Sequence, residues 1–409
     1  MLKKIGVQQL RVGMYLKEFC GSWMEHPFWR SAFVISDQKD IDAIRASSIR
    51  EVWIDSAKGR DVAADEPVCS VAEHEKQVDA ELAIAAQLER QLERVSTAAE
   101  FARAARIVAK SRQAVTSMFE EARMGRAVDA TSAQRLVEEI SDSVSRNPGA
   151  LISLARLKTA DDYTYMHSVA VCALMVALAR ELGMNEAQTR AAGTAGLLHD
   201  LGKAVMPLEV LNKPGKLTDA EFAIIRSHPE EGHRILQQAA KPDPVALDVV
   251  LHHHEKVDGS GYPKRLRADE ISIFAKMGAV CDVYDAITSN RPYKAGWDPA
   301  ESVRKMAEWS QGHFDARVFQ AFVKSIGIYP IGSLVLLSSG RLGVVTEQGA
   351  KSLLAPKVKV FFSTKLNARI RPELIDLGST GCPHRIVGRE DPEKWKFPDL
   401  NEMWCAAPS

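Results

Sequence analysis

The sequence TAGLLHDLGK at residues 194–203 sets a histidine and an aspartate side by side, His199 and Asp200, directly after a run of apolar residues. The apolar run and the glycine that follows it predict a hydrophobic helix that ends at Gly202, with both polar side chains near its end. Imidazole and carboxylate are ligand types that Fe, Mn and Zn accept, and a carboxylate can also bridge two ions. We therefore interpret this segment as part of a metal site, with Lys203 within one turn of it.

Further residues of the same types occur elsewhere in the chain. They are His167, His228, the run His252-His253-His254, and Asp282. A lone histidine on an apolar face is usually a core residue, so the density of the whole set is what indicates a metal site, and the set is too large for one tetrahedral ion. In RSHPEEGHRIL (226–236), His228 precedes a proline at an expected helix start. In KMGAVCDVYDAITS (276–289), Asp282 lies on an otherwise apolar helix, where a buried carboxylate needs a partner.

The composition is that of an ordinary globular protein, with 409 residues of which 46% are hydrophobic and 26% charged. Lys and Arg together number 53, as do Asp and Glu, so the chain lacks the general positive charge that drives non-specific nucleic-acid binding. The six cysteines are scattered without a CxxC pair, which favours reduced thiols and a cytoplasmic location. The longest apolar run, Val169 to Ala179, falls well short of the roughly 20 residues that span a bilayer, so we expect no membrane insertion.

The pattern of apolar residues divides the chain into four regions and predicts a mainly α protein. Residues 1–60 carry short strand-like runs around one helix, which indicates a small α+β module of regulatory type. Residues 61–130 are expected to form a linker (61–75) followed by connecting helices. Residues 131–328 have apolar residues at helical spacing and predict an all-helical domain. Residues 329–409 change to β-rich runs with a Ser-Gly hairpin signal, which predicts a small β-rich region.

The connecting helices allow two interpretations. Residues 73–124 are rich in Ala, Glu and Arg, and Leu82, Leu88, Leu92 and Val95 partly fit a helical seam. The favoured interpretation is a helix that packs on its own domain. The alternative is a coiled coil that forms a homodimer.

Segments of the helical region follow, in order, the motif series of a known family. They are TYMHSVAV (164–171), HDLGK (199–203), HPEEGHRIL (228–236), HHEKVDGSGYP (253–263) and DVYDAITSNRPYK (282–294). Through them the chain resembles HD-GYP proteins, a branch of the HD phosphohydrolases. The resemblance implies an all-helical HD-type metal-dependent phosphohydrolase domain that acts on the bacterial second messenger cyclic di-GMP. The N-terminal segments LRVGMYL, HPFW and IREVWID resemble a domain of unknown function that often precedes HD-GYP domains.

The resemblance also implies roles for single residues. The residues that match the family's metal ligands are His167, His199, Asp200, His228, His253, His254 and Asp282. Asp200 resembles the bridging ligand, and Asp200 and Lys203 are the expected catalytic residues, with Lys203 close to the bound phosphate. The residues expected to contact substrate are Tyr262, Asp285, Arg291 and Lys294, of which the last two resemble phosphate-contacting cations. His252 lies outside the motif and is expected to be a surface residue at a helix end.

A few positions depart from the family's pattern. Family members with three metals carry a glutamate where this chain has Tyr163, so we expect two divalent ions, Fe or Mn. Asn290 stands where aspartate is commoner, and Val257 where many members have an aromatic residue, but neither is a predicted ligand. Gly259 and Gly261 predict a fixed loop beside the ligands, and the resemblance implies that this loop shapes the substrate site or docks diguanylate cyclase domains.

The expected reaction is hydrolysis of cyclic di-GMP to linear pGpG, to GMP or to both, by a hydroxide shared between two metal ions. The main alternative is a receptor that binds cyclic di-GMP without turnover and signals through its N-terminal module, which the complete ligand set and Lys203 disfavour. An HD enzyme that acts on mononucleotides is disfavoured by the GYP loop and the RPYK cations, and a purely structural scaffold would not need this ligand set. The sequence leaves the native metal, the final product and the sensed signal open.

Overall fold

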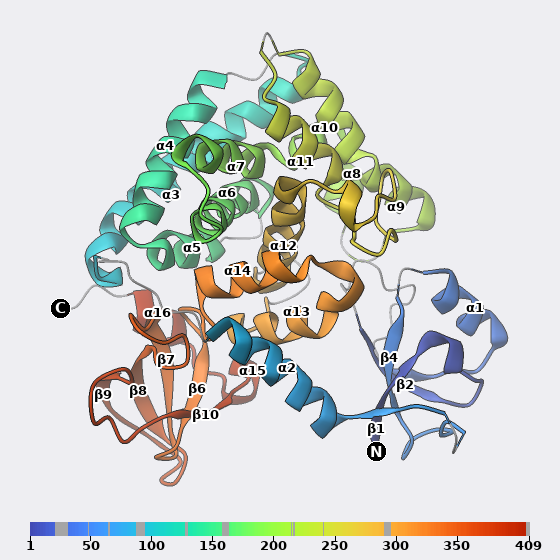
Figure 1. Cartoon of the computed structure of the whole chain (residues 1–409), viewed down its shortest axis with the longest axis vertical. Helices are drawn as coiled ribbons and strands as arrows, with labels where there is room; N and C mark the ends of the chain where they lie inside the picture. Colours follow the sequence, from blue (N-terminus) through green and yellow to red (C-terminus); the bar gives the residue numbers. More distant parts are fainter. Residues whose placement is uncertain are drawn as a thin grey trace. The chain divides into compact units, whose positions relative to one another are not determined.

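The computed structural model describes residues 1–20, 32–47, 49–63, 66–86, 95–126, 130–157, 163–213, 215, 217–239, 241–289 and 296–405. The chain divides into two compact units (Figure 1). One comprises Met1–Ala83 with Ala307–His313, and the other comprises Ile84–Met306 with Phe314–Ser409. Within the described ranges, no helix is both long enough and apolar enough to cross a membrane.

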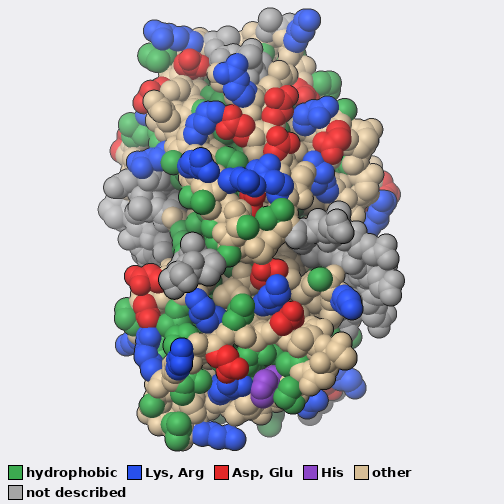
Figure 2. All heavy atoms as spheres, turned by 90° about the vertical axis from the view of Figure 1, so that its left-hand side faces the viewer, with side chains coloured by type: hydrophobic (Ala, Val, Ile, Leu, Met, Phe, Trp, Pro, Cys, Tyr) green, Lys and Arg blue, Asp and Glu red, His purple; other side chains and the backbone are tan. Residues whose placement is uncertain are grey.

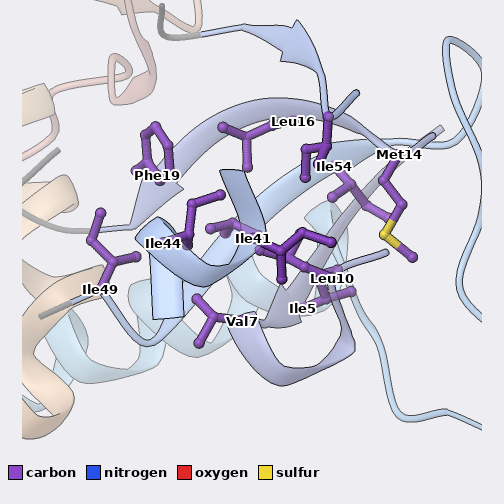
Figure 3. Close-up of a cluster of buried hydrophobic side chains, with 12 residues drawn as sticks. Ile5, Val7, Leu10, Met14, Leu16, Phe19, Ile41, Ile44, Ile49 and Ile54 are labelled. Carbon is purple, nitrogen blue, oxygen red and sulfur yellow. The ribbon is translucent and has the colours of Figure 1, made fainter. Parts of the chain in front are cut away.

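The N-terminal unit is built on an antiparallel sheet whose strand order is β3-β2-β4-β1-β5. The strands are β1 (Leu2–Gly6), β2 (Tyr15–Cys20), β3 (Phe33–Val34), β4 (Glu51–Asp55) and β5 (Cys69–Ser70). Helix α1 (Gln38–Ala46) begins after Asp37, whose side chain accepts a hydrogen bond from the Lys39 amide. Its buried Ile41 and Ile44 pack among apolar side chains of the sheet (Figure 3). The predicted α+β character of this region is confirmed.

The structure differs from the sequence prediction between residues 61 and 75, which were expected to form a linker. Here Cys69 and Ser70 form strand β5, which pairs with β1, and helix α2 (Val71–Ala86) begins directly after it. The helix start is stabilised reciprocally, because the Glu73 amide donates to Ser70 Oγ while the Glu73 carboxylate accepts from the Ser70 amide. Ser70 and Glu73 have the spacing of a capping box, a signal in the sequence that could have located this helix start.

The helical seam proposed for residues 73–124 stays a prediction. Helix α2 is followed by helix α3 (Thr97–Arg123), which begins after Ser96. Leu82 is buried and Val95 is 40% exposed, but Leu88 and Leu92 lie outside the described residues. Helix α3 packs against α4 (Ala130–Arg146), α5 (Pro148–Arg156) and α6 (Tyr163–Glu181), as the favoured interpretation of a helix packed on its own domain predicts, whereas the homodimeric coiled coil stays a prediction.

The larger unit contains the predicted all-helical domain. Beyond α3, its helices are α4 (Ala130–Arg146), α5 (Pro148–Arg156), α6 (Tyr163–Glu181), α7 (Glu186–Leu198), α8 (Leu208–Leu211), α9 (Asp219–Arg226), α10 (His228–Gln237), α11 (Pro244–His252), α12 (Ile273–Thr288) and α14 (Ala316–Ile326). Helix α13 (Pro299–His313) belongs to this unit only as far as Met306. Helix α6 is central, because it contacts α3, α5, α7, α12 and α14 (Figure 1). The apolar run from Val169 to Ala179 is buried throughout, as expected for a core helix.

The helix that was predicted to end at Gly202 ends earlier. Helix α7 stops at Leu198, His199 caps it, and a short 3-10 helix (Leu201–Val205) follows. A Cβ atom at position 202 would lie 1.9 Å from the His228 carbonyl oxygen. Gly202 is therefore needed because α10 packs directly against this turn, and it does not act as a helix stop.

The C-terminal part of the larger unit is an antiparallel sheet with the strand order β10-β6-β7-β8-β9. Its strands are β6 (Leu334–Leu337), β7 (Arg341–Glu347), β8 (Lys357–Ser363), β9 (Ala368–Asp376) and β10 (Ile386–Arg389). The predicted Ser-Gly hairpin lies between β6 and β7, and two short helices that the sequence did not predict, α15 (Pro392–Trp395) and α16 (Leu400–Cys405), follow the sheet. Figure 2 shows a face on which Lys and Arg side chains are interspersed with Asp and Glu, consistent with their equal numbers.

Candidate metal centre

The predicted metal ligands come from widely separated helices and meet in the larger unit. His167 lies on α6, His199 caps α7, Asp200 follows it, His228 begins α10, His253 and His254 follow α11, and Asp282 lies on α12. Their side chains are at most 6% exposed, except that of His254 at 13%. Pro229 lies in the first turn of α10, as the sequence predicted. His228 begins this helix, and its side chain joins the cluster.

The ligand atoms fall into two groups. Within each group, the atoms that could bind an ion all lie within 4.8 Å of one another. One group is Asp200, His228, His253 and His254, and the other is His167, His199 and Asp282. The structure thus brings together all seven residues expected to be metal ligands.

Asp200 lies between the two groups. Its Oδ1 atom is 3.2 Å from His228 Nε2 and 3.8 Å from His253 Nε2. Its Oδ2 atom is 3.5 Å from both His167 Nε2 and His199 Nε2. One carboxylate therefore presents a separate oxygen to each group, which is the arrangement that a bridging ligand requires.

The hydrogen bonds of the imidazoles leave lone pairs directed into the cluster. The Nδ1 atoms of His199 and His228 lie 2.8 Å and 2.7 Å from the carbonyl oxygens of Gly196 and Ile225, so each ring carries its proton on Nδ1. The opposite Nε2 atoms face other imidazoles closely, with His199 Nε2 3.2 Å from His167 Nε2. Lone pairs that converge at this distance repel each other unless a cation lies among them.

Two buried carboxylate oxygens support the same conclusion. Asp200 Oδ1 and Asp282 Oδ2 have no hydrogen-bond partner among the described residues. A buried ionised oxygen without a donor is costly, and coordination to a cation removes that cost. The donor set of imidazoles and carboxylates therefore fits divalent metal ions.

The electrostatics of the site keep its two carboxylates ionised and the imidazole of His253 neutral. Burial alone would raise the pKa of Asp200, but the Lys203 ammonium and the imidazole of His199 hold it well below its usual value. For Asp282, the hydrogen bond with His167 likewise outweighs burial and keeps the pKa low. Burial lowers the pKa of His253 to about 3. The carboxylates are thus ionised and this imidazole is neutral at neutral pH.

Lys203 and Asp285, which also have expected roles, make defined contacts beside the cluster. Lys203 Nζ donates a hydrogen bond to Asp200 Oδ2 at 2.5 Å. Asp285, which was expected to contact substrate or to orient its cations, lies with Oδ2 2.6 Å from His167 Nδ1 and with Oδ1 accepting from Ser289 Oγ at 3.2 Å. A carboxylate on the second nitrogen of a ligand histidine orients the ring and raises its basicity. The sequence did not predict this contact of Asp285.

His252 lies apart from the cluster, as expected. Its Nδ1 atom is 2.8 Å from Asp248 Oδ1, one helical turn away. Arg291, Lys294 and Asn290 lie outside the described residues, as does the side chain of Tyr163, so the interpretations of these residues stay predictions.

The loop that follows the paired histidines is held by a residue to which the sequence analysis gave no role. The buried Glu255 carboxylate accepts hydrogen bonds from the amides of Lys264, Arg265 and Leu266. Gly259 has a φ of +80°, and a Cβ atom on Gly261 would lie 2.4 Å from the Lys256 nitrogen. The fixed loop predicted from the two glycines is therefore present, and Glu255, the last residue of the His-His-Glu triplet, anchors its far end.

Tyr262 of this loop reaches the cluster through its ring. The ring stacks on that of His254 with a centroid separation of 4.6 Å and an interplanar angle of 24°. The guanidinium carbon of Arg226 lies 4.4 Å from the Tyr262 ring centroid. Tyr262 thus forms part of the wall of the metal cluster.

Two family models match the chain. One, described as HD domain, matches residues 138–318, and the other, described as a domain of unknown function (DUF3391), matches residues 2–133. Cyclic di-GMP phosphodiesterase PA4108 of Pseudomonas aeruginosa is 53% identical over 405 residues, which cover 99% of this chain and 96% of that protein. 3'3'-cGAMP-specific phosphodiesterase 1 of Vibrio cholerae is 37% identical over 164 residues, covering 40% of this chain and 38% of that protein. A cyclic di-GMP phosphodiesterase of Thermotoga maritima is 38% identical over 165 residues, covering 40% of this chain and 45% of that protein.

The region that matches the HD domain model is also the region that holds the metal cluster. The HD domain match contains every residue of the metal cluster, from His167 on α6 to Asp282 on α12. One relative is similar over nearly the whole of both chains, so the N-terminal and C-terminal regions are included. The chain therefore belongs to the HD-GYP family of metal-dependent HD phosphohydrolases.

Proposed function

We propose that this protein hydrolyses cyclic di-GMP at the metal cluster. The observation that carries the proposal is the paired ligand groups with Asp200 between them, because phosphodiester hydrolysis on two ions needs one shared ligand and an independent set for each ion. Two of the relatives described above are named cyclic di-GMP phosphodiesterases, one of them similar along the whole chain.

In the proposed site, His167, His199 and Asp282 hold one ion, and His228, His253 and His254 hold the other, with Asp200 shared. Bound ions supply the Lewis acidity that makes a water molecule nucleophilic at neutral pH. The oxygen of that water forms a bond to phosphorus while the bond from phosphorus to the 3′ oxygen breaks. Linear pGpG results first, and a second hydrolysis gives GMP. We assign the proton that the leaving 3′ oxygen needs to the Lys203 ammonium, which Asp200 holds in place.

The ions themselves are proposed to be Fe or Mn. A mixed set of imidazoles and carboxylates suits both metals. We expect two ions per chain because Tyr163 stands where a third ion would need a carboxylate ligand.

We also assign residues to the substrate and surfaces to protein partners. Arg291 and Lys294 are assigned to the phosphate groups, and Tyr262 and Asp285 to the wall of the substrate site. The GYP loop, anchored by Glu255, is the proposed docking surface for diguanylate cyclase domains, and the helical seam within residues 73–124 is the contact that a homodimer would use as the alternative to packing on its own domain. We place the reaction in the cytoplasm, a location that the free thiols of the cysteines favour.

Two alternatives to cyclic di-GMP hydrolysis are hydrolysis of 3'3'-cGAMP and binding of cyclic di-GMP without turnover. A relative in Vibrio cholerae is named as specific for 3'3'-cGAMP, which makes the mixed cyclic dinucleotide a second candidate substrate. A receptor that binds cyclic di-GMP without turnover would not need two complete groups of metal ligands with Lys203 beside them, so these residues disfavour it.

One experiment tests the proposal. The full chain is purified anaerobically, its metal content is measured, and its action on cyclic di-GMP and 3'3'-cGAMP is followed by chromatography of the products. We expect about two ions per chain and conversion of cyclic di-GMP to pGpG or GMP, lost on chelation and restored by Fe(II) or Mn(II). Faster turnover of 3'3'-cGAMP would correct the substrate, and metal-loaded protein that binds cyclic di-GMP without consuming it would establish the receptor.

A further inference from the structure

Arg226 lies beside the metal cluster, although the sequence analysis gave it no role. It is the last residue of α9 and precedes the cluster residue His228 by two positions. Its guanidinium packs on the ring of Tyr262, whose ring stacks on His254. Two planar groups that both lie within 4.6 Å of one ring centroid cannot share a face of that ring, so Arg226 and His254 occupy opposite faces of Tyr262.

The guanidinium of Arg226 contacts aromatic rings, and no acceptor for it is recorded in the part of the chain that the structure describes. Among the described residues, its only recorded partners are the rings of Tyr262 and, at 5.9 Å, Phe222. Three other cations of the same part of the chain, Lys213, Arg234 and Lys264, each pair with a glutamate. Arg226 is only partly buried, and none of its nitrogens is among the fully buried side-chain atoms that lack a partner, so its N–H donors are open to an incoming anion.

We infer that Arg226 is a substrate-binding residue that holds the phosphodiester of the cyclic dinucleotide that is not being cleaved. A guanidinium offers a planar fork of donors that matches two phosphate oxygens. The Tyr262 ring lies between Arg226 and His254, so the guanidinium does not contact this metal ligand and lies to one side of it. A substrate with two phosphodiesters carries a second anion at a distance from the first, and Arg226 would meet that anion. The inference rests on the proposed function, because only a cyclic dinucleotide substrate supplies this second phosphate.

Arg226 could instead act only by pressing Tyr262 onto His254. In that case its loss would disturb the ligand His254 and would reduce the hydrolysis of every phosphodiester equally. Bis(p-nitrophenyl) phosphate has a single phosphodiester and therefore reports on the metal centre without the second phosphate. A comparison of the two substrates separates the two roles.

The test measures kcat and KM of the metal-loaded full chain and of Arg226→Ala with cyclic di-GMP and with bis(p-nitrophenyl) phosphate. We expect KM for cyclic di-GMP to rise about ten-fold or more, as for the loss of a charge-assisted phosphate contact, with a much smaller change in kcat. The loss for bis(p-nitrophenyl) phosphate should be several-fold smaller. Arg226→Lys, which keeps the charge but not the fork, should give an intermediate KM.

The matched control is Arg234→Ala, which removes a surface arginine of the next helix that pairs with Glu231. It should behave as the unmodified protein does. An unchanged KM for cyclic di-GMP in Arg226→Ala would overturn the inference alone. An equal loss for both substrates, with reduced metal content, would also overturn it and would assign Arg226 to the support of Tyr262. If the unmodified protein hydrolyses bis(p-nitrophenyl) phosphate but not cyclic di-GMP, the proposed function fails and the inference fails with it.

Discussion

Asp285→Asn should weaken metal binding without unfolding the protein. The Asp285 carboxylate is buried and lies 2.6 Å from the Nδ1 atom of His167, a predicted ligand. Asparagine has nearly the same shape and can still accept that hydrogen bond through its carbonyl oxygen, but it removes the negative charge. The contact therefore changes from a charge-assisted hydrogen bond to a neutral one, with a cost of about 1–2 kcal/mol. Loss of such an outer partner of a ligand histidine typically lowers metal affinity about 10–100-fold.

The assay is a competition titration of the protein against a chelator of known affinity, read as metal bound per chain. Asp248→Asn is the matched control, because Asp248 pairs with His252 at 2.8 Å in the same domain but outside the cluster. We expect the affinity for one of the two ions to fall in Asp285→Asn and to stay unchanged in Asp248→Asn. If metal affinity is unchanged in Asp285→Asn while KM for cyclic di-GMP rises, the contact with His167 is not what matters. Asp285 would then act on substrate, as the sequence alone suggested.

Three further predictions concern other parts of the protein. Asp200→Ala should abolish hydrolysis and deplete both ions, because Asp200 presents one oxygen to each ligand group. Elemental analysis would measure the loss of metal, and circular dichroism would show that the variant is still folded. Replacing both Arg291 and Lys294 with Ala should leave metal content intact but lower the affinity or catalytic efficiency for cyclic di-GMP at least about ten-fold. Glu100→Gln should lower the free energy of unfolding at pH 7 by about 1–3 kcal/mol in urea denaturation, because the buried Glu100 accepts hydrogen bonds from Arg146.

The stabilisation that Glu100 contributes to the folded protein should decrease as the pH falls. Burial alone would raise the pKa of Glu100, but hydrogen bonds from Arg146 and Ser143 lower it below its usual value. A carboxylate with a lowered pKa in the folded state stabilises the protein above its unfolded pKa of about 4.3, and this stabilisation is lost as the pH falls through the folded pKa. The difference between the unmodified protein and Glu100→Gln should therefore shrink on acidification below about pH 4. A difference that is the same at pH 7 and at pH 3 would contradict this account.

The predictions for Asp200→Ala and for the double variant at Arg291 and Lys294 can each be refuted by one result. Asp200→Ala that retains metal and activity would remove the bridging carboxylate from the mechanism. If the double variant at positions 291 and 294 binds and cleaves cyclic di-GMP as the unmodified protein does, these residues are surface cations without a role in the site.

Much of the fold and the identity of the cluster residues followed from the sequence alone. The helical region, the α+β N-terminal module and the β-rich C-terminal region were predicted from the spacing of apolar residues, because burial of one face imposes a regular period on the chain. The ligand residues could be named because each belongs to a short motif, such as HDLGK or HHEKVDGSGYP, whose residues are neighbours in the chain. Strand β5 was missed because its two residues pair with β1, and a strand this short has no period of its own.

The arrangement of the site was decided by tertiary structure. Which oxygen of Asp200 faces which histidines depends on how α6, α7 and α10 pack, and the contact of Asp285 with His167 joins residues 118 positions apart. The stack of Arg226, Tyr262 and His254 likewise brings together the ends of α9 and of the GYP loop. A local motif specifies which groups are available, because its residues are adjacent in the chain. The distances between groups on different helices follow from the packing of the whole core, which no single segment encodes.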